Sequence, residues 1–226
     1  MTLEHVVSRS RVILRKIVGT SRADREADLL DVLTRASSPK LLLLGDSLME
    51  GSSAGISNPR VARGSYSGSR IADVLAVVSR VKGAHLWGKV AGAVVAIGIN
   101  DAQTSEGDDL EFRRLYFRSA LDALSRSLAG KPLVLLTITD IGSEGEWVSR
   151  YNRALIQMEN EEIAAMTAAN VFDAATLFRL SIERGGLAYD SAFRDGVHFS
   201  LEGYQHWNPL LEKAIDLASA GKLQPA

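Results

Sequence analysis

The chain has 226 residues, of which 46% are hydrophobic and 23% are charged. A soluble chain of this length buries roughly 70% of its unfolded surface, in one or at most two domains. Its 26 lysines and arginines nearly balance 27 acidic residues, for a formal net charge of -1. This balance excludes a chain-wide positive field, so we expect neither nucleic-acid binding nor attachment to an anionic membrane.

The chain contains no cysteine and only four histidines. Without cysteine there is no disulfide, no thiolate metal ligand and no cysteine nucleophile. No two histidines have the spacing of the His-Glu-x-x-His zinc motif. We therefore expect no structural or catalytic zinc site, and no other metal site.

The apolar runs of the chain are short. Residues 41–44, 93–97 and 133–136 fall far below the roughly 20 apolar residues that a membrane-spanning helix needs. Residues 12–14 are apolar, but Arg11 and Arg15 flank them and disfavour a signal peptide. We expect a cytoplasmic protein without a membrane span, with an organelle transit peptide as a minor alternative.

Residues 1–39 are interpreted as an N-terminal helical extension. Apolar residues at imperfect helical spacing predict a helix over residues 4–18. A second helix is predicted over residues 23–33, where apolar residues recur every three or four positions. Pro39 follows two serines and ends this pattern, so the main domain is expected to cover residues 40–226.

Strand-like and helix-like segments alternate through the main domain. Strands are expected at residues 40–44, 93–98, 133–138 and 170–173, with a weaker one at 60–62. Helices are expected at residues 71–81, 110–128, 147–168 and 201–218. Short apolar strands that alternate with amphipathic helices are typical of a parallel sheet covered on both faces. The predicted fold class is α/β, with about five strands.

Polar residues follow the predicted strands, at the edge where α/β proteins bind their ligands. Ser47 comes two residues after the first strand, where a helix would begin. A serine hydroxyl needs a base to become a nucleophile, and the base needs an orienting acceptor. Asp195 and His198, three residues apart, can supply both. Asn100 and the backbone amides of Ser47 and Gly68 are candidate donors to a developing oxyanion.

These residues belong to four ordered blocks that resemble the SGNH (GDSL) hydrolase family. The blocks are Gly45-Asp46-Ser47-Leu48-Met49-Glu50-Gly51, the isolated Gly68, Gly98-Ile99-Asn100-Asp101 and Asp195-Gly196-Val197-His198. The match covers about residues 40 to 215 and does not include the N-terminal extension. One departure is Phe199, where many relatives have proline.

The resemblance implies a flavodoxin-like three-layer α/β/α sandwich. It implies Ser47 as nucleophile, His198 as base and Asp195 as the residue that orients the base. It also implies an oxyanion hole of Ser47, Gly68 and Asn100. The expected activity is that of a serine esterase acting through an acyl-enzyme, with no cofactor.

Two other motifs are weaker. An α/β-hydrolase needs Gly-x-Ser-x-Gly around its nucleophile, but Met49 occupies the last position. Residues 83–90 match most of a phosphate-binding loop, but Val90 replaces the required Ser or Thr. We interpret that match as accidental.

Several further side chains are candidates for the rim of the site. Possible substrate-lining residues are Asp46, Asp101, Asp140 and Trp147, while Trp87, Trp207 and His206 are expected to be mainly structural. The acidic run Glu159, Glu161 and Glu162 is interpreted as a solvated helix face.

The expected substrates are short-chain esters, such as O-acetyl groups on a carbohydrate, because the spacing between the blocks leaves no room for a large lid domain. Lysophospholipase, thioesterase and acyltransferase activities stay open as alternatives, as does a non-catalytic ligand-binding module. The sequence does not determine the oligomeric state.

Overall fold

The computed structural model describes residues 21–52, 58–105 and 109–221. The helix predicted over residues 4–18 lies outside these ranges. At the start of the first range, α2 (Arg22–Arg35) is capped by Ser21, which exchanges hydrogen bonds with Asp24. The predicted second helix of the extension is confirmed, and it begins and ends within two residues of the expected bounds.

Five parallel strands form the sheet at the centre of the molecule. They are β1 (Lys40–Gly45), β2 (Val61–Ser65), β3 (Val90–Ala96), β4 (Leu133–Leu136) and β5 (Asn170–Phe172). Their spatial order is β2-β1-β3-β4-β5, and every pairing is parallel. The predicted parallel α/β sheet is confirmed.

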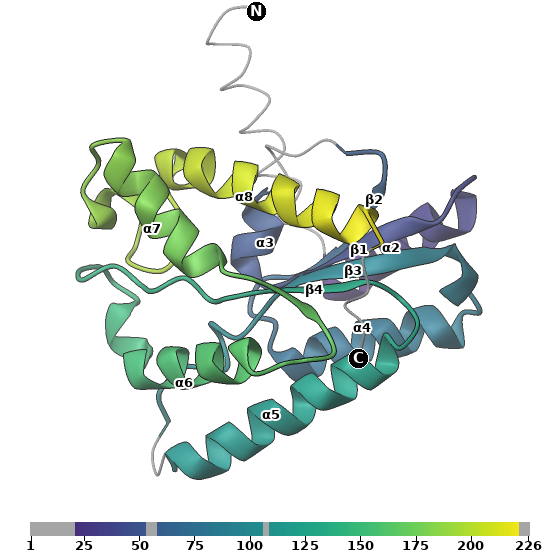
Figure 1. Cartoon of the computed structure of the whole chain (residues 1–226), viewed down its shortest axis with the longest axis horizontal. Coiled ribbons are helices and arrows are strands. Elements are labelled where there is room, and N and C mark those ends of the chain that lie inside the picture. The colour runs from purple at the N-terminus through teal and green to yellow at the C-terminus, as the bar shows by residue number, and fades with distance from the viewer. Residues whose placement is uncertain (1–20, 53–57, 106–108, 222–226) are drawn as a thin grey trace, which may run out of the picture.

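Helices cover both faces of this sheet, as Figure 1 shows. One face carries α3 (Ser47–Gly51), α7 (Ala174–Arg184) and α8 (Leu201–Ser219). The other face carries α4 (Ile71–Gly83), α5 (Leu110–Ser127) and α6 (Arg153–Ala164), which pack side by side. The result is the expected three-layer α/β/α sandwich, with α2 packed against edge strand β2.

The core lies between the layers. Leu42, Leu43 and Leu44 of β1 have no exposed surface, as befits a strand that is buried on both faces. Beneath α8, aromatic rings pack on one another around Phe178 and Phe199, whose centroids are 4.6 Å apart. No helix in the described ranges is long and apolar enough to cross a membrane.

The structure corrects three of the sequence predictions. Helix α6 begins at Arg153 and not at residue 147, because the side chain of Asn152 caps it by accepting from the amide of Ala154. Helix α7 was not predicted. Glu159 and Glu162 are 2% and 3% exposed, so they do not belong to a solvated face.

Candidate active site

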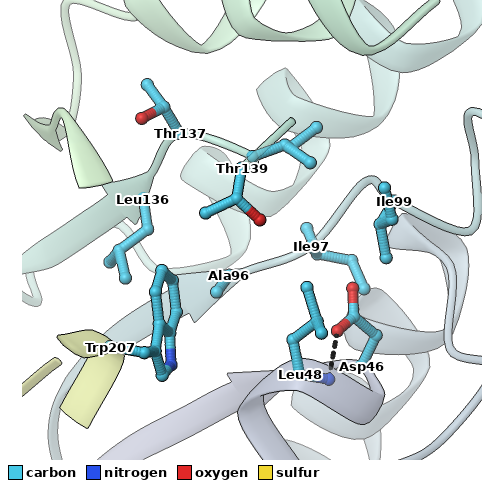
Figure 2. A pocket seen from close by; sticks show the side chains of 10 residues that line it. Asp46, Leu48, Ala96, Ile97, Ile99, Leu136, Thr137, Thr139 and Trp207 are labelled. Atoms are coloured by element: carbon cyan, nitrogen blue, oxygen red, sulfur yellow. Dashed lines mark hydrogen bonds between the residues drawn. The ribbon is translucent and has the colours of Figure 1, made fainter. Parts of the chain in front are cut away.

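Ser47 is the first residue of α3, directly after β1. Asp46 is the N-cap of this helix, and its carboxylate accepts a hydrogen bond of 2.9 Å from the amide of Leu48 (Figure 2). Gly45 lies so close to β3 that an added Cβ would approach the carbonyl oxygen of Ala96 to 2.4 Å. The turn that carries Ser47 is therefore fixed against the centre of the sheet.

Helix α8 contacts α3 through the side chain of Tyr204. The hydroxyl of Tyr204 donates to the carbonyl of Leu48 at 3.3 Å and lies 3.5 Å from the carbonyl of Ser47. Gly51 leaves room for the Tyr204 ring, which a Cβ at that position would strike. The last helix thus positions the candidate nucleophile, and the sequence motifs alone do not predict this contact.

Asp195 and His198 form the pair that their spacing predicts. The Nδ1 atom of His198 lies 2.9 Å from Oδ2 of Asp195. The other carboxylate oxygen, Oδ1, accepts from the backbone amides of His198 at 2.8 Å and Val197 at 3.2 Å. With Nδ1 donating to the carboxylate, Nε2 carries the free lone pair that a base needs.

The ionised form of Asp195 is favoured by these donors. Burial by itself raises the pKa of Asp195, but the hydrogen bonds from the backbone and ring of His198, together with the charge of the ring, outweigh it and lower the pKa. Asp195 can therefore orient the imidazole and stabilise its charged form.

The loop between β4 and α6 supports this pair. The amide of Gly142 donates to the carbonyl of Gly196 at 2.8 Å, and the amide of Trp147 donates to that of Asp195 at 3.3 Å. The Trp147 ring packs edge-on against the His198 ring, with centroids 6.4 Å apart. The Arg150 guanidinium lies over the face of the Trp147 ring, 4.1 Å from its centroid. Trp147 was expected on a helix, but it lies in the loop beside the candidate base.

Gly68 and Asn100 belong to neighbouring loops. Gly68 has φ +75, and an added Cβ would meet no atom within 4 Å, so its surroundings are open. The Asn100 side chain is only 5% exposed, and its Nδ2 donates to the carbonyl of Ser69 at 3.0 Å. That bond uses one of the two amide hydrogens and leaves the other for a ligand.

Two residues that the motifs did not predict hold Asn100 in place. Its Oδ1 lies 3.2 Å from Nε2 of Gln103 and 3.4 Å from the hydroxyl of Tyr151. Gln103 also donates to that hydroxyl at 3.1 Å. Tyr151 comes from a segment far along the chain, so only the tertiary structure could reveal its role.

Asp46 and Asp101 are buried beneath the site, at 3% and 5% exposure. The Asp101 carboxylate accepts from the amide of Ile71 at 3.0 Å and so ties the Asn100 loop to the start of α4. Burial raises the pKa of each carboxyl to about 7. We assign both residues a positioning role and no longer expect them on the rim.

Two tyrosines connect the loop that carries Ser47 with the loop that carries Asp195 and His198. Tyr204 contacts the carbonyl of Ser47, and its ring packs edge-on against that of Phe199, the residue after His198. Burial raises the pKa of Tyr151, and the charges of both Asp46 and Asp195 raise it further. The two candidate catalytic loops therefore lie around the same tyrosines.

Other candidates lie elsewhere or serve the scaffold. Asp140 forms an ion pair with Arg153, and a second one with Arg179 at 3.4 Å. Trp87 precedes β3, at the opposite edge of the sheet, with Lys82 over its ring at 4.7 Å. The His206 ring lies 2.8 Å from the hydroxyl of Ser181, between α8 and α7.

A small cavity behind α3 is lined by Asp46, Leu48, the ends of β3 and β4, and Trp207 (Figure 2). Its volume is about 20 Å³. A space of this size holds about one water molecule. We therefore do not assign it to the acyl group of a substrate.

Solved structures with this fold come from several bacteria. A lipase/acylhydrolase from Enterococcus faecalis is 18% identical with a TM-score of 0.57, covering 83% of this chain and 100% of its own. The catalytic domain of peptidoglycan O-acetyltransferase A from Streptococcus pneumoniae is 14% identical with a TM-score of 0.59, covering 84% and 99%. An acetylxylan esterase from Geobacillus stearothermophilus is 20% identical with a TM-score of 0.51, covering 80% and 95%.

At these low sequence identities, the structural similarity shows that the fold is shared. No curated protein matches the sequence significantly. The model of the GDSL-like Lipase/Acylhydrolase family, in contrast, matches residues 43–206, which include all four blocks. The chain therefore belongs to the GDSL-like Lipase/Acylhydrolase family, and it is a serine hydrolase of ester bonds.

Proposed function

We propose that Ser47, His198 and Asp195 form a catalytic triad that hydrolyses esters of short acyl groups. The observation that carries the proposal is the Asp195 carboxylate, which binds Nδ1 of His198 at 2.9 Å and also accepts the backbone amide of His198. This arrangement fixes the tautomer in which Nε2 can accept a proton from Ser47.

In the first half of the reaction, the Ser47 oxygen attacks the ester carbonyl carbon while Nε2 of His198 takes the hydroxyl proton. The amides of Ser47 and Gly68 and the Asn100 side chain donate to the resulting oxyanion. The intermediate then collapses, the bond to the alcohol breaks, and His198 returns the proton to the leaving alcohol.

In the second half, water attacks the acyl-enzyme. His198 removes a proton from the water and returns it to the Ser47 oxygen as the acid leaves. Throughout the cycle Asp195 stays ionised and stabilises the positively charged imidazole. Apart from the ester and water, these steps use only groups of the chain itself.

Short acyl groups, such as O-acetyl on a carbohydrate, are the proposed substrates. The segment between β4 and α6 contains only a 3-10 turn, η3 (Val148–Arg150), and thus no lid domain over the His198 side. Among the similar folds, one is called an acetylxylan esterase and another a peptidoglycan O-acetyltransferase, and both names refer to acetyl esters of carbohydrates. We place the enzyme in the same substrate class.

The test compares wild type with Ser47→Ala on p-nitrophenyl esters from acetate to decanoate. We expect the acetate to react fastest and the variant to lose roughly 10⁴- to 10⁶-fold in turnover. Ser79→Ala, on the exposed side of α4, is the matched control, and circular dichroism checks the folding of each protein. Full activity in Ser47→Ala would exclude the triad, and a preference for decanoate would exclude the short-chain assignment.

A second assay separates hydrolysis from transfer. Acetate release is measured with and without a carbohydrate acceptor that lacks acetyl groups. We expect free acetate in both cases, because nothing in the described site favours an alcohol over water. Acetylated carbohydrate as the main product would instead assign the same triad to an acyltransferase.

A further inference from the structure

Helix α2 precedes the region matched by the family model. We propose that it positions the Gly68 loop (residues 66–70) for oxyanion binding, through Arg25 and Glu50. The inference rests on the proposed function, since it assigns a partner to the Gly68 donor. It gives the N-terminal extension a role that the family motifs do not contain.

Glu50 is the centre of this connection. It lies on α3, three residues after Ser47, and its side chain is 13% exposed. One carboxylate oxygen forms an ion pair with the Arg25 guanidinium of α2. The other accepts the backbone amide of Ser67 at 2.7 Å. A single carboxylate thus joins the extension, the nucleophile helix and the residue directly before Gly68.

Tyr66 adds a second contact between the same elements. Its ring is 2% exposed, and the guanidinium groups of Arg22 and Arg25 lie 5.6 Å and 5.5 Å from the ring centroid. The amide of Tyr66 donates to the carbonyl of Gly45, just before the nucleophile turn. The start of the Gly68 loop is therefore held between α2 and the end of β1.

The other end of the loop is held by contacts with the Asn100 loop, and also by Asp73 of α4, which accepts the amide of Arg70 and pairs with Arg22 of α2. The carbonyl of Ser69 accepts from Asn100, and the amide of Ile71 donates to Asp101. Gly68 itself lies between these anchors with open surroundings, in a turn that the amide of Ser69 closes by donating to the carbonyl of Tyr66 at 3.1 Å. The Glu50 bond to Ser67 holds this turn from the side of the nucleophile helix.

Loss of the Glu50 bond to Ser67 should weaken the stabilisation of the transition state. An oxyanion donor interacts most strongly with the charge that develops during reaction, so its misplacement lowers kcat and leaves KM nearly unchanged. A complete loss of one donor costs roughly 100- to 1000-fold in kcat. We expect a smaller effect, of roughly five- to fiftyfold, because the donor would be loosened and not removed.

The experiment compares Arg25→Met with Arg35→Met in the full chain. Both arginines lie on α2, but Arg35 is exposed and pairs with Asp31 of the same helix and not with Glu50. We expect Arg25→Met to lower kcat on p-nitrophenyl acetate with little change in KM, and Arg35→Met to keep both within about twofold. Equal losses in the two variants would overturn the proposal and indicate general loosening of α2.

Variants of Glu50 test the same connection should Arg25→Met fold poorly. Glu50→Gln keeps an acceptor for the Ser67 amide, whereas Glu50→Ala removes it, so activity should fall in the order wild type, Gln, Ala. In the Glu50→Ala background, Arg25→Met should have no further effect on kcat. Additive losses would show that Arg25 acts by another route and would overturn the proposal.

Amide hydrogen exchange gives a readout that does not depend on catalysis. We expect faster exchange at Ser67 in Arg25→Met and Glu50→Ala than in Arg35→Met. Unchanged exchange at Ser67 would contradict the connection even if activity fell. If Ser47→Ala were fully active, the proposed function would fail; if Ser47→Ala were inactive and Arg25→Met normal, only this inference would fail.

Discussion

Carboxyl groups in two regions near the carboxyl ends of the strands differ in the direction in which folding shifts their pKa values. Asp195 lies in the loop before α8 and receives hydrogen bonds from two amides and from the His198 ring, which lower its pKa. Beneath the Asn100 loop, Asp101 and Glu159 are more deeply buried, and burial raises their pKa values to about 7 and about 10.

The depth of burial, set against the donors that face the carboxyl, therefore decides whether each carboxyl is charged. Glu159 has one buried oxygen, Oε2, without a hydrogen-bond partner among the described residues. A charge at that place has little to stabilise it. We infer that Asp195 serves chemistry as an anion, while Glu159 serves packing as a neutral acid.

Among variants of these carboxyl groups, the largest expected effect comes from removing the charge of Asp195. Asp195→Asn should lower kcat by roughly 10²- to 10⁴-fold with folding preserved, because the amide cannot stabilise the charged imidazole. The measurement is hydrolysis of p-nitrophenyl acetate. Asp190→Asn is the matched control, because Asp190 binds Ser143 at the loop surface. Equal activity in the two variants would remove the distinction between the regions.

A smaller effect is expected from Glu159→Gln, and it concerns stability. Folding raises the pKa of Glu159 from 4.5 to about 10. The stabilisation that the neutral carboxyl gives to the folded protein is therefore fully present below about pH 4.5, and it is lost progressively as the pH rises towards 10. The glutamine does not titrate, so the variant should gain at least about 1.4 kcal/mol over wild type at about pH 9, the equivalent of one pKa unit.

Urea denaturation of wild type and Glu159→Gln at about pH 5 and about pH 9 measures this difference. Glu161→Gln, at the surface of the same helix, is the control and should follow the wild type. If the difference in the free energy of unfolding between wild type and Glu159→Gln were the same at pH 9 as at pH 5, the carboxyl would not be held neutral.

The smallest expected effect concerns the ring that packs against His198. Trp147→Phe should lower kcat by roughly two- to tenfold, because the shorter ring loses part of its edge-on contact with the imidazole. The same assay measures it. Trp87→Phe, at the opposite edge of the sheet, should keep wild-type kcat. A larger loss for Trp87→Phe would show that general stability, and not support of the base, explains the effect.

The amino-acid sequence alone predicts the order of the strands along the chain and the loops that follow them. Short apolar runs predicted four of the five strands to within three residues, because strands buried on both faces consist almost entirely of apolar side chains. The pair Asp195 and His198 was also predictable, since three residues of spacing let their side chains meet within one turn.

Contacts between residues far apart in the chain became visible only in the folded structure. It buries Glu159 under the Asn100 loop, places Gln103 and Tyr151 on the Asn100 side chain, and joins Arg25 to Glu50. Local pattern could not reveal these contacts, because a charged or polar residue has the same sequence neighbours whether its partner is solvent or a distant helix. Burial and partner are properties of the packed layers, and they fix the pKa values and positions on which the proposed chemistry depends.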